Sequence, residues 1–139
     1  MFQPYISNGQ FYGLLGLGSF YWAAAAVAIR YAGHVLFRSR ESELTFFASL
    51  APISYGVMSF SESVIGLDTR HRLVSASIMS SMALLLDGTA FMFFPEVYEN
   101  PEMSKTDRQK AVYHSRKGAA SILWGVGVIL GIALYTTTY

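Results

Sequence analysis

Four long apolar stretches dominate this sequence of 139 residues. A helix needs about 20 mainly apolar residues to cross the hydrocarbon core of a bilayer, which is roughly 30 Å thick. The stretches cover residues 11–37, 44–66, 73–94 and 118–135. None of them shows the alternation of apolar and polar residues that marks a membrane β-strand. The sequence therefore predicts an all-α integral membrane protein with four spanning helices.

The composition argues against other classes of protein. Hydrophobic residues make up 53% of the chain and charged residues 14%, whereas a soluble domain has about 45–50% and about 25%. The formal net charge of +1 provides no general attraction for nucleic acid. The chain has no cysteine and therefore no disulfide, thiolate zinc site or iron–sulfur cluster. We expect neither a nucleic-acid partner nor a metal site.

The connections between the stretches predict the topology. Residues 38–43 and 67–72 form short connections, which favour antiparallel neighbours. The third connection runs from Pro95 to about Lys117, and its Ser104–Asp107 segment has the form of a capping box. The last helix is therefore expected to begin near Ser104, ahead of its spanning part at 118–135. We expect a single domain, 1–139, folded as an up-down-up-down four-helix bundle.

Basic residues predict the orientation of the bundle. The first and third connections together hold seven of them, whereas the second holds Arg70 and Arg72 only. Because basic loops remain on the cytoplasmic side, both termini are predicted to lie on the outer, non-cytoplasmic side. The first ten residues lack the cationic start of a secretory signal, so we expect the first helix to remain in the mature protein. The expected location is a bacterial inner membrane or the membrane of an energy-transducing organelle.

Ionisable residues within the spanning helices are the candidates for chemistry, because burying them in a membrane is costly. Arg30 and Asp87 each lie seven residues before the predicted inner end of their helix. Equal depth predicts an Arg30–Asp87 ion pair across the bundle. This pair is interpreted either as a structural clasp or as part of a polar pathway. Arginine keeps its proton and pairs well with carboxylates, which favours the clasp.

Two further residues could extend this network. His34 follows Arg30 by one helical turn and lies on the same face. Glu62 lies near the outer boundary of the second stretch, where Arg70 and Arg72 are candidate ion-pair partners. An interfacial histidine and an interfacial ion pair are the simpler interpretations.

Small residues recur at helical spacing in three of the stretches, and such repeats allow helix backbones to approach closely. The predicted packing positions are Ala24, Ala28, Ala32, Ser77, Ser81, Gly127 and Gly131. The last two form a GxxxG motif. We expect these positions to support helix packing rather than chemistry.

Catalytic and nucleotide-binding motifs such as HExxH, the P-loop and GxGxxG are absent from the sequence, so an enzyme is unsupported. No cofactor is predicted. Three cofactor contacts remain compatible with the sequence. They are bis-histidine ligation of haem by His34 and His114, and contact of a pigment or of a quinone with Tyr21 and Trp22. Bound lipid is expected for any chain of this kind.

The segments IRYAGHVLF, LLLDGTAFMFFPEVY and AASILWGVGVILGIAL resemble a family of small four-helix bacterial membrane proteins of unknown function. The residues that carry the resemblance are Arg30, Asp87, Pro95, Tyr98, Trp124 and Gly125. The resemblance implies the four-helix topology and no activity.

Two functions are compatible with the sequence. The first is an accessory or assembly subunit of a larger membrane complex, respiratory or photosynthetic, with lipids and other membrane subunits as partners. Small size, packing stripes and the lack of a catalytic constellation favour it. The second is a small proton or solute carrier or channel, in which Asp87 and Arg30 line a polar intramembrane cavity.

Overall fold

The structure is a computed structural model that describes residues 6–138. This part of the chain is 91% helical and contains no β-strand. The long helices are α1 (Asn8–Leu36), α2 (Arg40–Ile65), α3 (Arg72–Phe93) and α5 (Arg108–Thr138). Shorter elements connect them, namely η1 (Thr69–His71), η2 (Pro95–Tyr98) and α4 (Pro101–Thr106).

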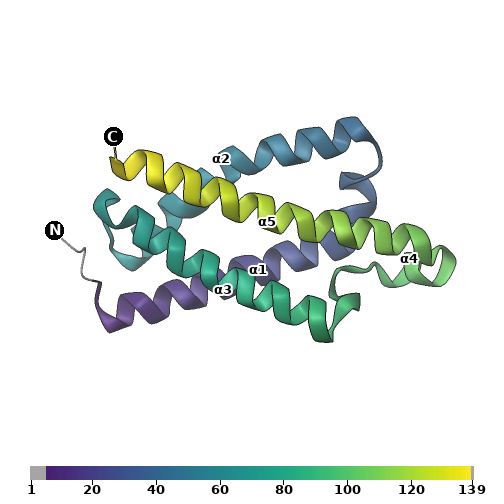
Figure 1. Cartoon of the computed structure of the whole chain (residues 1–139), viewed down its shortest axis with the longest axis horizontal. Coiled ribbons are helices and arrows are strands. Elements are labelled where there is room, and N and C mark those ends of the chain that lie inside the picture. Colours follow the sequence, from purple (N-terminus) through teal and green to yellow (C-terminus); the bar gives the residue numbers. More distant parts are fainter. Residues whose placement is uncertain (1–5, 139) are drawn as a thin grey trace.

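The four long helices lie side by side along the long axis of the molecule (Figure 1). Helix α3 packs mainly against α1 and α5, while α2 packs mainly against α5 and α1. The start of α1, the end of α5 and the α2–α3 connection lie at one end, which we call the α2–α3 end (Figure 1). The opposite end, formed by residues 37–40, η2, α4 and the start of α5, carries seven of the ten basic residues, and we call it the basic end.

All four long helices are long and apolar enough to cross a membrane. Between 17% and 28% of each apolar window is buried within the chain. Most of the apolar surface therefore faces outward, where only lipid or another membrane protein can cover it favourably. These features are consistent with an integral membrane protein.

The first three helices follow the predicted stretches 11–37, 44–66 and 73–94 closely, but the predicted start of the last helix is wrong. The hydroxyl of Ser104 donates to Glu99 at 3.1 Å and caps nothing. The short helix α4 is capped instead by Asn100. The carboxylate of Asp107 then accepts from the backbone N–H of Lys110 at 3.1 Å. Helix α5 therefore begins just after Asp107, because this residue offers the better cap.

One glycine lets α1 and α3 approach each other closely. A Cβ built on Gly18 would lie 2.6 Å from the carbonyl oxygen of Met79. Because this neighbour is backbone, it cannot move aside as a flexible side chain would. Gly118 plays a similar part between α5 and α1, where a Cβ would collide with Ile29. These two contacts are the close packing that small residues permit between membrane helices.

Candidate functional site

A buried tyrosine joins the polar groups near the basic end. Pro95 opens η2, which turns the chain back towards the bundle after α3. Tyr98 ends this turn and is only 1% exposed. Its hydroxyl donates to Oδ1 of Asp87, which is also buried, and accepts from Nε1 of Trp22 at 3.1 Å. Burial and the hydrogen bond to Asp87 raise the pKa of Tyr98, so the hydroxyl remains a donor at neutral pH.

Arg30 fixes the same turn from α1. Its Nη1 atom donates to the carbonyl oxygens of Glu96 at 3.0 Å and Val97 at 3.3 Å. Both carbonyls belong to η2. The guanidinium therefore satisfies backbone oxygens in the turn that places Tyr98 in the core.

The predicted Arg30–Asp87 ion pair is not formed. Within residues 6–138 neither side chain takes part in an ion pair. The depth argument was incomplete, because equal depth does not determine where two side chains point. The turn η2 supplies the carbonyls that bind Arg30 and the hydroxyl that binds Asp87. The two residues thus act on the same turn through different partners.

Glu62 lies at the α2–α3 end, away from this cluster, and pairs with Arg72. Nε of Arg72 donates to both carboxylate oxygens of Glu62, at 2.9 Å and 3.1 Å. The two residues are 6% and 9% exposed. The guanidinium also lies 5.7 Å from the ring centroid of Tyr55. Of the two expected partners, Arg72 rather than Arg70 forms the pair, and both side chains are buried within the bundle.

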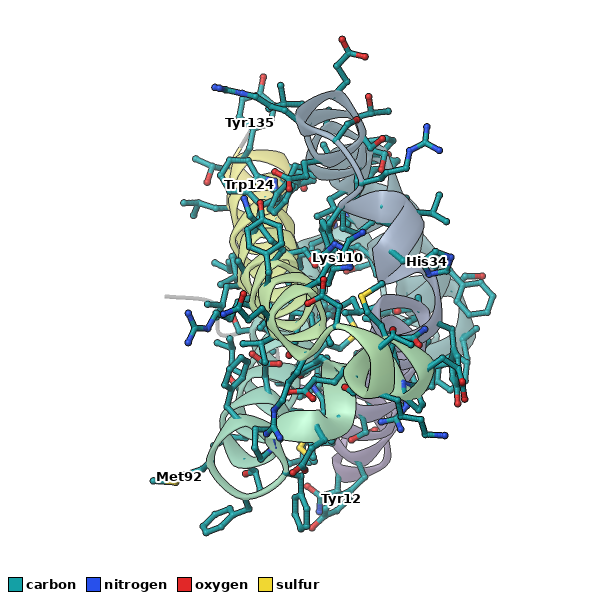
Figure 2. The ribbon with its side chains drawn as sticks, turned by 90° about the vertical axis from the view of Figure 1, so that its right-hand side faces the viewer. Tyr12, His34, Met92, Lys110, Trp124 and Tyr135 are labelled. Carbon is teal, nitrogen blue, oxygen red and sulfur yellow. The ribbon has the colours of Figure 1, made fainter. Side chains whose placement is uncertain are left out.

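His34 is exposed in the last turns of α1 and has no hydrogen bond or ion pair to Arg30 among the residues that the structure describes. It lies close enough to His114 of α5 for their charges to interact. Figure 2 looks onto the basic end and shows His34 to one side of Lys110. The structure therefore does not bring His34 and Glu62 into one network with Arg30 and Asp87. No group of three or more potential metal ligands occurs within the described part of the chain.

The predicted packing stripes do not hold the four helices together. Ala24, Ala28 and Ser81 are exposed, and Ala32 and Ser77 are half-buried. A Cβ built on Gly127 or Gly131 would have no atom of the described residues within 4 Å. The inner face of α1 consists of Leu14, Gly18, Ala26, Ile29 and Gly33. Small-residue spacing does not identify the inner faces of these helices, because small apolar residues are equally acceptable on an outward apolar surface.

On α3, Ser75 and Ser80 are the serines that face inward, not Ser77 and Ser81. The hydroxyl of Ser77 donates to the carbonyl oxygen of Leu73 in its own helix at 2.7 Å. The hydroxyl of Ser80 is buried without a hydrogen-bond partner among the described residues, and this residue lines a void of about 50 Å³ between the helices. A void of this size has room for a water molecule.

Two contributors were missed at the sequence level, namely Tyr98 as a buried donor and His114 as a buried imidazole. Tyr98 follows Pro95 closely, and a proline that ends a helix is a signal for such a turn. Nothing in the sequence around His114 distinguishes it from a surface histidine.

Comparison of the chain with protein-family models, with curated proteins and with solved structures finds no match. The resemblance to small four-helix bacterial membrane proteins stays a prediction. The fold and the site define a helical chain with four candidate membrane spans. Its three predicted intramembrane ionisable residues, Arg30, Glu62 and Asp87, each bind a partner within the chain.

Proposed function

We propose that this chain is a small accessory or assembly subunit of a larger membrane protein complex, respiratory or photosynthetic, with a structural rather than a catalytic role. Its four spans form an up-down-up-down bundle with both termini on the outer side of a bacterial inner membrane or an energy-transducing organelle membrane. Short connections and the excess of basic residues at one end support this arrangement.

The contrast between inner and outer glycines carries the proposal. Gly18 and Gly118 meet neighbouring helices so closely that a Cβ would collide. Gly127 and Gly131 lie one turn apart on α5 and have open space instead. Glycines at this spacing let another helix backbone approach closely. Since α5 does not use this face within the chain, a helix of another subunit is the partner that it fits.

The polar groups of the bundle support a structural role as well. Arg30, Glu62 and Asp87 are each hydrogen-bonded inside the chain. Groups that are used in this way stabilise the bundle, and this supports a structural role.

The test is a double variant, Gly127→Leu with Gly131→Leu, expressed in the native host and extracted in mild detergent. Native mass spectrometry should show wild-type protein with stoichiometric partner subunits, and the variant without them. Its thermal midpoint should be unchanged, because both glycines face outward. Gly56→Leu is the matched control, since a Cβ on this outward glycine of α2 also meets nothing within 4 Å. A wild-type chain that runs alone, or a double variant that keeps its partners, would overturn the proposal.

A carrier or channel is the second candidate. The buried hydroxyl of Ser80, which has no partner among residues 6–138 and lies beside a small void between the helices, favours it. Neither Asp87 nor Arg30 lines that void. The substitution Asp87→Asn separates the candidates. A structural Asp87 predicts loss of stability or assembly, whereas a pathway predicts an assembled protein that loses flux or its pH dependence in vesicles.

A further inference from the structure

A cavity of about 630 Å³ opens at the basic end, between the α1–α2 connection and α5. Four cationic side chains line it, namely Arg38, Arg40, Lys110 and Lys117. Lys110 lies near the middle of this end of the molecule (Figure 2). The only acidic residue in the lining is Glu43. The cavity therefore concentrates positive charge at one place on the basic end.

Most of this positive charge is uncompensated. The carboxylate of Glu43 is already occupied, since it accepts from Nζ of Lys117 at 3.1 Å and from the hydroxyl of Tyr113 at 3.2 Å. The side chains of Arg38, Arg40 and Lys110 form no hydrogen bond or ion pair with any residue in the described range 6–138. Like charges held together repel one another, so the empty cavity favours an anion. Guanidinium groups match the oxygens of a phosphate in pairs, which points to a phosphate group in particular.

A buried imidazole in the same cavity points to a ligand independently of the charge. His114 lines the cavity and is only 6% exposed. Its Nδ1 atom is buried and has no hydrogen-bond partner among the described residues. Such atoms are rare, because burying a polar atom without a partner is costly. The rings of Phe37 and Tyr113 hold the imidazole in place, with centroids at 6.1 Å and 5.9 Å. A ligand oxygen would complete the hydrogen bonding of this atom.

The surroundings of the cavity favour a lipid over a soluble ligand. Leu44 and Tyr113 also line it and are 62% and 49% exposed. Both belong to helices that are candidate membrane spans, α2 and α5. Acyl chains can therefore lie against these outward residues while a headgroup occupies the cationic cavity. Basic pockets between spanning helices at a membrane surface bind anionic headgroups in this way.

We propose that this cavity binds the phosphate group of an anionic phospholipid, with Arg38, Arg40 and Lys110 as charge partners and Nδ1 of His114 as a hydrogen-bond donor. A soluble phosphate shares this chemistry and is the other source that the experiment distinguishes. The proposal is independent of the accessory-subunit function. It requires only that the basic end lies at a membrane surface.

The experiment titrates the delipidated full-length protein in mild detergent with phosphatidylglycerol or phosphatidylcholine and counts bound lipids by native mass spectrometry. Phosphatidylglycerol should bind at least about tenfold more tightly than phosphatidylcholine. Each of Arg38→Gln, Arg40→Gln and Lys110→Gln should weaken it about fivefold, the effect of one basic residue near an anionic lipid. These side chains have no hydrogen-bond or ion-pair partner in the part of the chain that the structure describes, so the variants should fold normally.

Two matched controls separate this cavity from general surface charge. Arg116→Gln removes an exposed charge from the same end but not from the cavity, and Arg70→Gln removes one from the α2–α3 end. Both variants should bind phosphatidylglycerol like the wild type. His114→Leu should weaken binding without lowering the thermal midpoint of the lipid-free protein, because it removes a polar atom that has no partner there.

The source of the phosphate is tested by competition. Excess inorganic phosphate should fail to displace phosphatidylglycerol. If it displaces the lipid and binds the lipid-free protein as tightly, the ligand is a soluble phosphate and the lipid assignment is wrong. Equal binding of the two lipids, or an effect of Arg116→Gln as large as that of Arg40→Gln, would overturn the site altogether.

Discussion

The charged side chains at the two ends of the bundle differ in whether they have partners within the chain. At the α2–α3 end, Glu62 and Arg72 form a buried ion pair in which Nε of Arg72 donates to both carboxylate oxygens, and neither residue has much contact with solvent. At the basic end, Arg38, Arg40 and Lys110 surround a cavity and bind nothing within residues 6–138. Burying an ion pair costs desolvation, which only good geometry offsets. Charges at the first end are therefore used to hold the fold, whereas those at the second are available to a ligand.

The largest effect on stability is expected from Arg72→Met, which breaks the buried ion pair at the α2–α3 end. This substitution leaves Glu62 buried without its partner, and breaking a buried ion pair in this way costs about 3–5 kcal/mol. The thermal midpoint in mild detergent, measured by circular dichroism, should fall sharply.

Two further variants show whether the loss comes from the unpaired carboxylate. The double variant Arg72→Met with Glu62→Gln should recover much of the stability, because it removes the uncompensated charge. Arg70→Met removes an exposed arginine beside the same turn and should change nothing. If Arg72→Met proves as stable as Arg70→Met, the buried pair does not stabilise this end.

A smaller loss is expected from Tyr98→Phe near the basic end. The change removes the hydroxyl that donates to Asp87 and accepts from Trp22. Leaving a buried polar group without a partner costs about 1–3 kcal/mol. Tyr113→Phe is the control, because that residue is 49% exposed and water can replace its contact with Glu43. Equal midpoints for the two variants would show that the basic end does not depend on its buried hydroxyl.

The hydroxyl of Tyr98 also makes the stability of the protein depend on pH. Burial and the hydrogen bond to Asp87 raise the pKa of Tyr98, whereas an unfolded tyrosine titrates near about 10. The folded protein therefore holds this proton more tightly than the unfolded chain does. The stability that this provides is fully present below about pH 10 and is lost as the pH rises towards the pKa of the folded state. In Tyr98→Phe, the midpoint should fall less than in the wild type over this alkaline range.

The four long apolar helices could be predicted from the sequence because their length and apolar composition can be read along one dimension. The inner face of each helix could not. In a soluble helix the outer face is polar, but here Ala24 and Ala28 face outward while Ala26 is buried, and all three are alanine. Apolar periodicity carries no information when lipid covers the other side.

Some of the polar contacts could also be predicted from the sequence, and others could not. The pairing of Glu62 with Arg72 could be predicted from the sequence, because a short connection joins their helices and leaves few other partners for Glu62. The contacts of Arg30 and Asp87 depend on η2, a turn of four residues that brings its carbonyls and Tyr98 between them. Helix depth alone does not predict where an irregular turn will enter a bundle.

The smallest effect is expected from the Lys117–Glu43 ion pair, which bridges α2 and α5 at the basic end. Nζ of Lys117 lies 3.1 Å from Oε2 of Glu43, and the lysine side chain is 37% exposed. Exposed pairs contribute little, because water and salt screen them and both side chains lose conformational freedom. Lys117→Gln should therefore leave the thermal midpoint unchanged. Lys117→Gln should nevertheless weaken phosphatidylglycerol binding, since it removes a cation from the cavity. Glu43→Gln should have the opposite effect and strengthen binding, because Glu43 is the acidic residue of the cavity lining. A clear loss of stability in Lys117→Gln would mean that the basic end, like the α2–α3 end, uses its charges to hold the fold, and the difference between the two ends would disappear.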